Sequence, residues 1–317
     1  MKQTRTKRAV MRRALLGLTL VALLAVYAAA ASGIASSASA AGKATYYLAL
    51  GDSLAAGCQP IGPPFCFGRD FSVTELDQGS QGYTDQLFKA VRDKYTELQL
   101  VNRSCGGETT GSMIVGRAAG SICTYPEGSQ LNSAVSFLRS HRGEIAFITI
   151  DIGANDILGA CFDPSTGLLG EACVQAQLPT LGTNLATILG ALAAVAPGVP
   201  IAGMSYYNPL LGYWVLVPGP IGQYLAQSDE AVAEEFDSAL VADYQADGAL
   251  VADVAGAFGI SDFTDMAELK GFGQVPLNVA NACNWTWFCT PPPLGPDIHA
   301  TTDGYGMIAQ AFEDVLP

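Results

Sequence analysis

The stretch that decides the fold is Tyr46-Tyr47-Leu48-Ala49-Leu50, which is followed directly by Gly51-Asp52-Ser53-Leu54. The first five residues are all apolar or aromatic, a pattern that predicts a buried β-strand. In α/β proteins, ligands and chemistry are found at the carboxyl ends of the strands of a parallel sheet. Ser53 therefore stands where such a protein would place a nucleophile.

Apolar runs alternate with amphipathic stretches along the rest of the chain. The clearest run is Ile145-Ala146-Phe147-Ile148-Thr149-Ile150, which is apolar almost throughout. This alternation predicts an α/β fold in which helices cover both faces of a central parallel sheet. We expect strands at residues 45–50, 98–102, 145–151, 200–206 and 249–253, and helices at residues 83–96, 130–140, 181–195, 229–246 and 302–315.

Residues 1–40 have the pattern of a secretory signal peptide. A basic segment precedes the apolar residues 14–31, and Ala38-Ser39-Ala40 fits a cleavage site. A retained membrane anchor is the alternative, because the apolar segment approaches the roughly 20 residues that span a bilayer. Its alanine-rich composition and the cleavable tail favour the signal peptide. The pair Arg12-Arg13 leaves export by the twin-arginine route open beside the Sec route.

The composition predicts one acidic domain over residues 41–317. The whole chain carries 16 Lys and Arg against 29 Asp and Glu, a net charge of −13. Six of the basic residues lie in the leader, so the mature chain is more acidic still. This charge argues against binding to nucleic acid and against docking on anionic membranes. We expect a secreted monomer with no membrane insertion after cleavage of the signal peptide.

All eight cysteines follow the leader, and an even number in a secreted chain favours disulfides. Sequential pairing would close four local loops, although 105 connectivities are possible in principle. A zinc site is less well supported, because the chain has no Cys-x-x-Cys pair and no histidine cluster. The predicted pairs are Cys58–Cys66, Cys105–Cys123, Cys161–Cys173 and Cys283–Cys289.

Two histidines are the candidates for a general base beside Ser53. His299 ends the segment Pro296-Asp297-Ile298-His299, whereas His141 lies in a polar segment where we expect a surface position. Ser53 and His299 lie at opposite ends of the domain, as is common when the fold brings catalytic groups together. Taken singly, Ser53 could be a turn or cap residue, and His299 could belong to the loop that caps the next helix.

Two further blocks could supply an oxyanion hole. Gly107 lies in the segment 102–110 after the second predicted strand, and its N–H could donate to a developing oxyanion. Asn155 lies in Gly153-Ala154-Asn155-Asp156 after the third strand, and its side-chain amide could donate as well. The backbone N–H of Ser53 would be a third donor.

The order of these blocks resembles the SGNH hydrolase superfamily, also called the GDSL esterase/lipase family. Gly51-Asp52-Ser53-Leu54, the segment 102–110, Gly153-Ala154-Asn155-Asp156 and His299 match its four blocks in turn. A single four-residue match would be weak, but four ordered blocks are specific. The resemblance implies a flavodoxin-like three-layer α/β/α sandwich, hydrolysis of esters or thioesters, and an oxyanion hole of Ser53, Gly107 and Asn155.

The last block departs from the family pattern, in which an acid stands three residues before the histidine. Pro296 occupies that position here, and Asp297 stands only two residues before His299. The imidazole needs an acceptor for its N–H, and either Asp297 or the Pro296 carbonyl could supply one. We slightly favour the carbonyl, because it would keep the three-residue spacing; Asp297 remains a candidate catalytic residue.

Two aromatic segments could line a groove for an acyl chain. The segment 206–218 follows the fourth strand, and Trp285, Trp287 and Phe288 lie between two cysteines upstream of His299. Core packing is the alternative for each residue, and tryptophan could also stack on sugars.

The sequence therefore predicts a secreted serine lipase or esterase that acts on small-molecule or lipid esters and uses no cofactor or metal. A polysaccharide O-deacetylase and a non-catalytic binding protein on the same fold are the alternatives.

Overall fold

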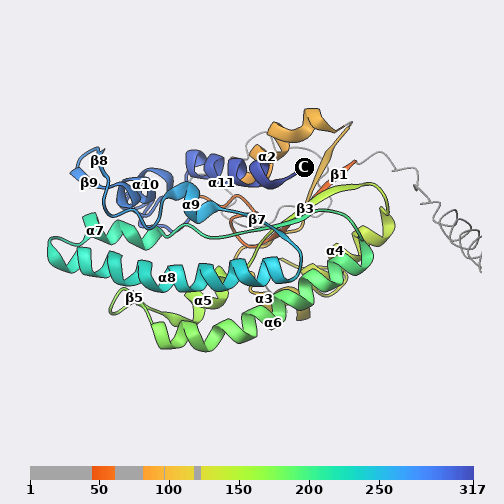
Figure 1. The fold of residues 1–317 in the computed structure, drawn as a ribbon, viewed down its shortest axis with the longest axis horizontal. Coiled ribbons are helices and arrows are strands. Elements are labelled where there is room, and N and C mark those ends of the chain that lie inside the picture. Colours follow the sequence, from red (N-terminus) through yellow and green to blue (C-terminus); the bar gives the residue numbers. More distant parts are fainter. Residues whose placement is uncertain (1–44, 61–80, 96, 118–122) are drawn as a thin grey trace, which may run out of the picture. The chain divides into compact units, whose positions relative to one another are not determined.

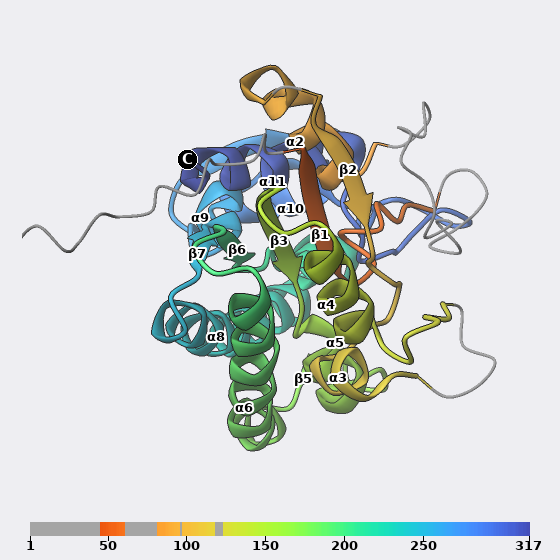
Figure 2. The ribbon, with the colours of Figure 1, turned by 90° about the vertical axis from the view of Figure 1, so that its right-hand side faces the viewer.

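A five-stranded parallel sheet lies at the centre of the structure, a computed structural model that describes residues 45–60, 81–95, 97–117 and 123–317. The predicted signal peptide lies outside these residues. Figure 1 shows the whole fold, and Figure 2 labels the five strands of this sheet. Along the sheet the order is β2-β1-β3-β6-β7, the arrangement of flavodoxin-like folds. The strands are β2 (Gln99–Asn102), β1 (Tyr46–Gly51), β3 (Ile145–Asp151), β6 (Ile201–Met204) and β7 (Leu250–Ala252).

The two central strands, β1 and β3, are buried because helices cover both faces of the sheet. All seven residues of β3 are buried, and Leu48 and Ile148 pair in register between the strands. Polar atoms inside these strands find partners, since the Tyr47 hydroxyl and Thr149 Oγ1 lie 2.8 Å apart. Continuous apolar runs of this kind are typical of parallel strands with two covered faces.

The helices form two layers, one on each side of the sheet (Figures 1 and 2). One layer contains α2 (Tyr83–Val91), α9 (Val254–Phe258) and α11 (Thr302–Val315). The other contains α4 (Gln130–Ser140), α6 (Glu171–Val195) and α8 (Pro220–Ala246). This arrangement confirms the predicted three-layer α/β/α sandwich.

Cap residues explain why two helices have the bounds that the sequence predicts. Ser129 accepts a hydrogen bond from the Asn132 N–H before α4, and Thr301 accepts one from the Gly304 N–H before α11. Such caps satisfy backbone donors that the helix itself leaves unpaired.

Two other helices begin earlier than predicted. Helix α6 starts at Glu171 instead of residue 181 and continues through Pro179. Proline lacks an N–H, so Pro179 leaves the carbonyl of Gln175, four residues earlier, without its helical hydrogen bond. Both residues are exposed, so water can bond to that carbonyl. Helix α8 starts at Pro220 instead of residue 229, and proline is favoured at the first position of a helix.

Several short elements occupy segments that the sequence predicts as loops. Disulfides tie three of these segments, Cys105–Cys123, Cys161–Cys173 and Cys283–Cys289, as predicted. The fourth predicted pair includes Cys66, which lies outside the described residues. The short elements are α3 (Thr110–Val115), α5 (Ala154–Cys161), β4 (Phe162–Asp163), β5 (Leu168–Leu169), η2 (Pro209–Gly212), α7 (Tyr213–Leu216), β8 (Met266–Leu269), β9 (Gly273–Pro276) and α10 (Leu277–Trp285). The helix predicted at residues 83–96 is α-helical only to Val91 and continues as the 3₁₀ helix η1 (Arg92–Lys94).

Close packing at Gly203 in β6 makes a stability prediction possible. A Cβ at this position would lie 2.3 Å from the buried ring of Tyr244. We expect Gly203→Ala to lower the free energy of unfolding by about 1–3 kcal/mol through overpacking. The matched control is Gly190→Ala in α6, where a Cβ would meet nothing within 4 Å. That change should raise stability by about 0.5–1 kcal/mol through helix propensity. Urea unfolding of both variants tests this contrast, and a Gly203→Ala protein as stable as wild type would contradict it.

Candidate active site

The predicted catalytic blocks meet at the carboxyl ends of β1 and β3. Ser53 follows β1, and Asn155 lies in the first turn of α5, directly after β3. In this strand order the chain reverses direction along the sheet between β1 and β3. A ligand crevice forms at such a reversal in open α/β sheets.

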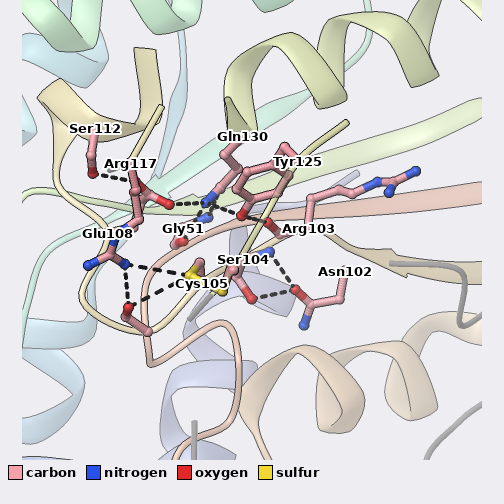
Figure 3. Close-up of a disulfide and its surroundings, with 12 residues drawn as sticks. Gly51, Asn102, Arg103, Ser104, Cys105, Glu108, Ser112, Arg117, Tyr125 and Gln130 are labelled. Atoms are coloured by element: carbon pink, nitrogen blue, oxygen red, sulfur yellow. Dashed lines mark hydrogen bonds between the residues drawn. A yellow bond between two sulfur atoms is a disulfide. The ribbon is translucent and has the colours of Figure 1, made fainter. Parts of the chain in front are cut away.

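Gly51 fixes the path of the chain into this site. Its φ is +131°, and a Cβ there would lie 2.2 Å from the carbonyl oxygen of Asp151, so only glycine fits. Gln130, the first residue of α4, holds the same glycine from the other side (Figure 3). The Gly51 N–H donates to Gln130 Oε1 at 2.7 Å, and Gln130 Nε2 donates to the Gly51 carbonyl at 3.0 Å.

A pair of buried carboxyls, Asp52 and Asp151, lies beneath Ser53. Asp52 Oδ1 accepts from the Leu54 N–H at 2.9 Å, and Asp151 accepts from the Ala55 N–H at 3.1 Å and the Tyr83 hydroxyl at 2.8 Å. Burial raises the pKa of Asp52, and burial together with the charge of Asp52 raises the pKa of Asp151 well above its usual range. Two buried carboxyls in contact do not both ionise at neutral pH, so the pair retains a proton.

Asn155 is held by the two loops that carry the other predicted oxyanion donors. Its Nδ2 donates to Asp52 Oδ2 at 3.1 Å and to the Glu108 carbonyl at 3.0 Å. These bonds fix the orientation of the side chain and engage both amide hydrogens. To bind an oxyanion, Asn155 must therefore share or exchange one of these acceptors.

Gly107 has a φ of +72° and is exposed. Within the described chain no hydrogen bond uses its N–H, and Gly107 is not among the residues that line the cavity described below. The next residue, Glu108, is fully buried and accepts hydrogen bonds from the Ser112 hydroxyl and from Gln130 Nε2. Burial raises the pKa of Glu108 above its usual value.

His299 is oriented by Asp297, and the preference for the Pro296 carbonyl is wrong for this structure. Asp297 Oδ1 lies 2.8 Å from His299 Nδ1 and also accepts from the His299 backbone N–H at 2.9 Å. The carboxylate folds back onto the residue two positions ahead, as in an Asx turn, which explains the short spacing. Burial would raise the pKa of Asp297, but its hydrogen bonds with His299 outweigh burial and lower it. With Nδ1 bonded to the carboxylate, Nε2 is free to accept a proton.

Ser53, Asn155 and His299 line one cavity. The described residues on its walls are mainly apolar and come from the loop after β1, from α5 and β5, from the segment after β6 and from α8. They include Leu54, Ile157, Leu158, Leu169, Leu210 and Phe236.

Only one of the two predicted aromatic segments contributes to this cavity. Tyr206 and Tyr207 line it. Trp285 packs edge-on against Phe258, and Phe288 packs against Tyr213; neither lines the cavity. Core packing, the alternative interpretation, therefore describes Trp285 and Phe288. The half-buried Trp287 does not line the cavity either, and its indole N–H donates to Gln59 Oε1 at 3.3 Å.

His141 is half-buried and does not line the cavity. It caps the end of α4 and stacks on Phe137 with ring centroids 4.2 Å apart. The predicted surface position is therefore correct only in part, since the ring packs against an aromatic neighbour.

Sequence reasoning missed the groups that support the predicted catalytic residues. No individual role was predicted for Asp52, Asp151, Glu108 or Gln130. A usable signal was Asp151 itself, because a carboxylate that ends an apolar strand must find hydrogen-bond donors when it is buried. Within the described residues, no group of three His, Cys, Asp or Glu side chains is placed to hold a metal ion.

The fold is similar to that of solved hydrolases. An extracellular lipase from Streptomyces rimosus has a TM-score of 0.56 and 17% sequence identity, covering 86% of this chain and 100% of the lipase. A phospholipase A1 from Streptomyces albidoflavus has a TM-score of 0.47 and 16% identity, covering 86% and 99%. No curated protein matches the sequence. At 17% identity, the likeness to the Streptomyces rimosus lipase shows the fold alone.

The sequence itself shows the family. Residues 49–307 match the GDSL-like lipase/acylhydrolase family over most of the chain. This span contains Ser53, Gly107, Asn155 and His299 in the order that the resemblance requires. The chain therefore belongs to the GDSL-like lipase/acylhydrolase family.

Proposed function

We propose that this protein is a secreted serine esterase or lipase that cleaves acyl esters at Ser53. The observation that supports this most strongly is one apolar cavity that contains Ser53, Asn155 and His299, with Asp297 bonded to His299. These residues come from the two ends of the chain and from its middle. Secretion is supported by the disulfides and by the predicted leader.

In the proposed first step, His299 Nε2 takes the proton of the Ser53 hydroxyl as Oγ attacks the ester carbonyl. Asp297 keeps Nδ1 protonated and stabilises the imidazolium that forms. The tetrahedral intermediate then collapses, and His299 returns the proton to the departing alcohol. Water enters by the same route and releases the acid from the acyl-enzyme.

The N–H groups of Ser53 and Gly107 and the amide of Asn155 are the proposed oxyanion donors. In the structure, the Asn155 amide already donates to Asp52 and to the Glu108 carbonyl. The negative charge that develops on the substrate oxygen is a stronger acceptor than the neutral carbonyl of Glu108. Asn155 can therefore bind the transition state more tightly than the substrate, which is the requirement for catalysis.

Apolar side chains on the cavity walls favour an acyl group over a sugar as the occupant. Ile157 and Leu158 of α5 line the cavity together with Ala233 and Phe236 of α8. Hydrophobic walls select for apolar area and do not by themselves select one chain length. A lipase or esterase is therefore the main proposal, and an O-deacetylase is an outcome of the test below.

Two buried carboxyls lie at or next to the wall of this cavity, Asp237 in its lining and Glu230 bonded to the lining residue Asn208. Asp237 lines it and accepts from the Tyr206 N–H at 2.8 Å. Glu230 accepts from Asn208 Nδ2 at 2.9 Å. Burial raises the pKa of Asp237 to about 8 and the pKa of Glu230 to about 8. At neutral pH both are therefore mainly uncharged, which suits an apolar ligand.

The first prediction from this proposal concerns activity. Chromogenic esters from acetyl to palmitoyl should be hydrolysed, with the highest kcat/KM for medium or long chains. Ser53→Ala should lower kcat by at least about 10⁴-fold in a protein that remains folded. Activity confined to acetyl would identify a deacetylase. A folded, oxidised protein without Ser53-dependent turnover would refute the esterase proposal and favour a binding protein.

A second prediction tests the cavity as the acyl site. Ala233→Leu adds bulk to its wall from α8. We expect the ratio of kcat/KM for long over short esters to fall by about 10-fold, because the longer chain loses its space. Ala242→Leu, at an exposed position of the same helix, is the control. An unchanged preference in Ala233→Leu would place the acyl chain elsewhere.

The third prediction is a pH dependence of stability. Asp237 and Glu230 keep their protons up to about pH 8 in the folded protein but release them near pH 4 in the unfolded chain. The folded state binds more protons in this window, so stability is greatest below it and falls as pH rises, by up to about 1.4 kcal/mol per pH unit for each group. Asp237→Asn with Glu230→Gln should flatten this fall.

Urea unfolding at pH values across the same window measures the slope. Glu268→Gln, at an exposed position of β8, is the matched control and should keep the wild-type slope. A double variant with the wild-type slope would show that Asp237 and Glu230 titrate normally in the folded state.

A further inference from the structure

Arg117 reaches back from the segment after α3 to the loop that carries Gly107. Its Nη1 donates to the Gly106 carbonyl at 2.6 Å and lies 3.5 Å from Cys105 Sγ (Figure 3). Its Nη2 lies 3.3 Å from the place where a Cβ of Gly107 would stand. The guanidinium therefore packs directly against Gly106 and Gly107.

The bonded carbonyl and the proposed oxyanion donor belong to one peptide unit. The C=O of Gly106 and the N–H of Gly107 share a planar, trans amide, so they point in opposite directions. A donor that fixes the carbonyl fixes the direction of the N–H. Gly107 is an exposed residue, and within the described residues its N–H has no hydrogen-bond partner. It is therefore available to a substrate oxygen.

The bond also changes the electronic character of the amide. A charged donor on the carbonyl oxygen draws electron density toward that oxygen, which makes the N–H at the other end a stronger donor. Arginine keeps its charge at every working pH. The neighbouring carboxyl of Glu108 accepts hydrogen bonds from Ser112 and Gln130, and the charge of Arg117 partly offsets the rise that burial causes in its pKa. The hydrogen bond that Arg117 itself makes here goes to the Gly106 carbonyl.

We propose that Arg117 is a positioning residue of the oxyanion hole, which orients and polarises the peptide that presents the Gly107 N–H. The proposal rests on the esterase function proposed above. In this proposal, the position of the loop and the orientation of its Gly106–Gly107 peptide are set by different groups. The disulfide Cys105–Cys123 and the bond from the Cys105 N–H to the Gly51 carbonyl, at 3.1 Å, hold the loop beside β1. Arg117 sets the orientation of one peptide within it.

The test compares steady-state kinetics of wild type, Arg117→Ala and Arg117→Gln on the best ester of the series. Arg117→Ala should lower kcat by about 10- to 100-fold and leave KM within about two-fold, because the lost interaction strengthens only in the transition state. Arg117→Gln keeps a neutral donor and should lose less activity. Arg142→Ala removes one exposed arginine after α4 and should behave as wild type.

Two further measurements separate this role from simple support of the fold. Guanidinium ion at millimolar concentration should partly restore kcat to Arg117→Ala and leave Arg142→Ala unchanged. A boronic acid that forms a tetrahedral adduct with Ser53 should bind Arg117→Ala more weakly by about the factor lost in kcat/KM. If the alanine variant does not fold, the glutamine variant provides both comparisons.

The outcomes distinguish this inference from the function on which it rests. Unchanged kcat and boronate affinity in the variants, with Ser53-dependent activity in wild type, would overturn the role of Arg117 alone. A merely structural role would show itself as a loss of kcat with a matching fall in Tm, no guanidinium rescue and unchanged boronate affinity. That result would also overturn the proposed role of Arg117. Absence of Ser53-dependent turnover in wild type would remove the proposed function and the inference together.

Discussion

The rest of the structure depends on the close approach of β1 and β3 at Gly51 and Asp151. A Cβ at position 51 would collide with the Asp151 carbonyl, so the contact requires glycine. There the chain leaves β1 with the Asp52 N–H bonded to that carbonyl at 3.1 Å, and the Asp52 side chain reaches Asn155 at the start of α5. One backbone contact thus sets the relative position of the segments that follow two neighbouring strands.

Buried carboxyls, which are unfavourable unless they are bonded, shape the site around this contact. Asp52, Asp151 and Glu108 all lie beneath the edge of the sheet, where burial raises the pKa of each. Hydrogen-bond donors compensate for the lost hydration. Two of these donors, Gln130 and Asn155, also bond to the backbone of Gly51 and Glu108. The bonds that satisfy the carboxyls are therefore the bonds that orient the proposed catalytic groups.

This connection explains what the sequence could and could not predict. Apolar runs predicted all five strands of the main sheet to within two residues, because burial on both faces leaves a continuous signal. Helix α6 was predicted too short because a proline such as Pro179 usually ends a helix. The helix continues through Pro179 because this position is exposed and water can bond the freed carbonyl. The Asp297–His299 bond could not be derived from residue spacing, since it depends on a turn of the backbone. The Asn155–Asp52 bond joins residues 103 positions apart, a distance at which local patterns carry no information.

The structure supports the two sides of the proposed reaction by different means. The loop that carries His299 is fixed largely through the backbone, since the Trp287 N–H donates to the His299 carbonyl at 3.0 Å and the Asp297 N–H donates to the Trp287 carbonyl at 3.3 Å. One side chain adds to this, because the Tyr207 hydroxyl donates to the Ile298 carbonyl at 2.9 Å. The oxyanion side depends on side chains, with Gln130, Arg117 and Asn155 all bonded to backbone carbonyls of neighbouring loops. Side-chain substitution can remove those bonds one at a time, whereas main-chain bonds survive it. Sequence changes around this site should therefore alter stabilisation of the transition state more readily than the placement of the base.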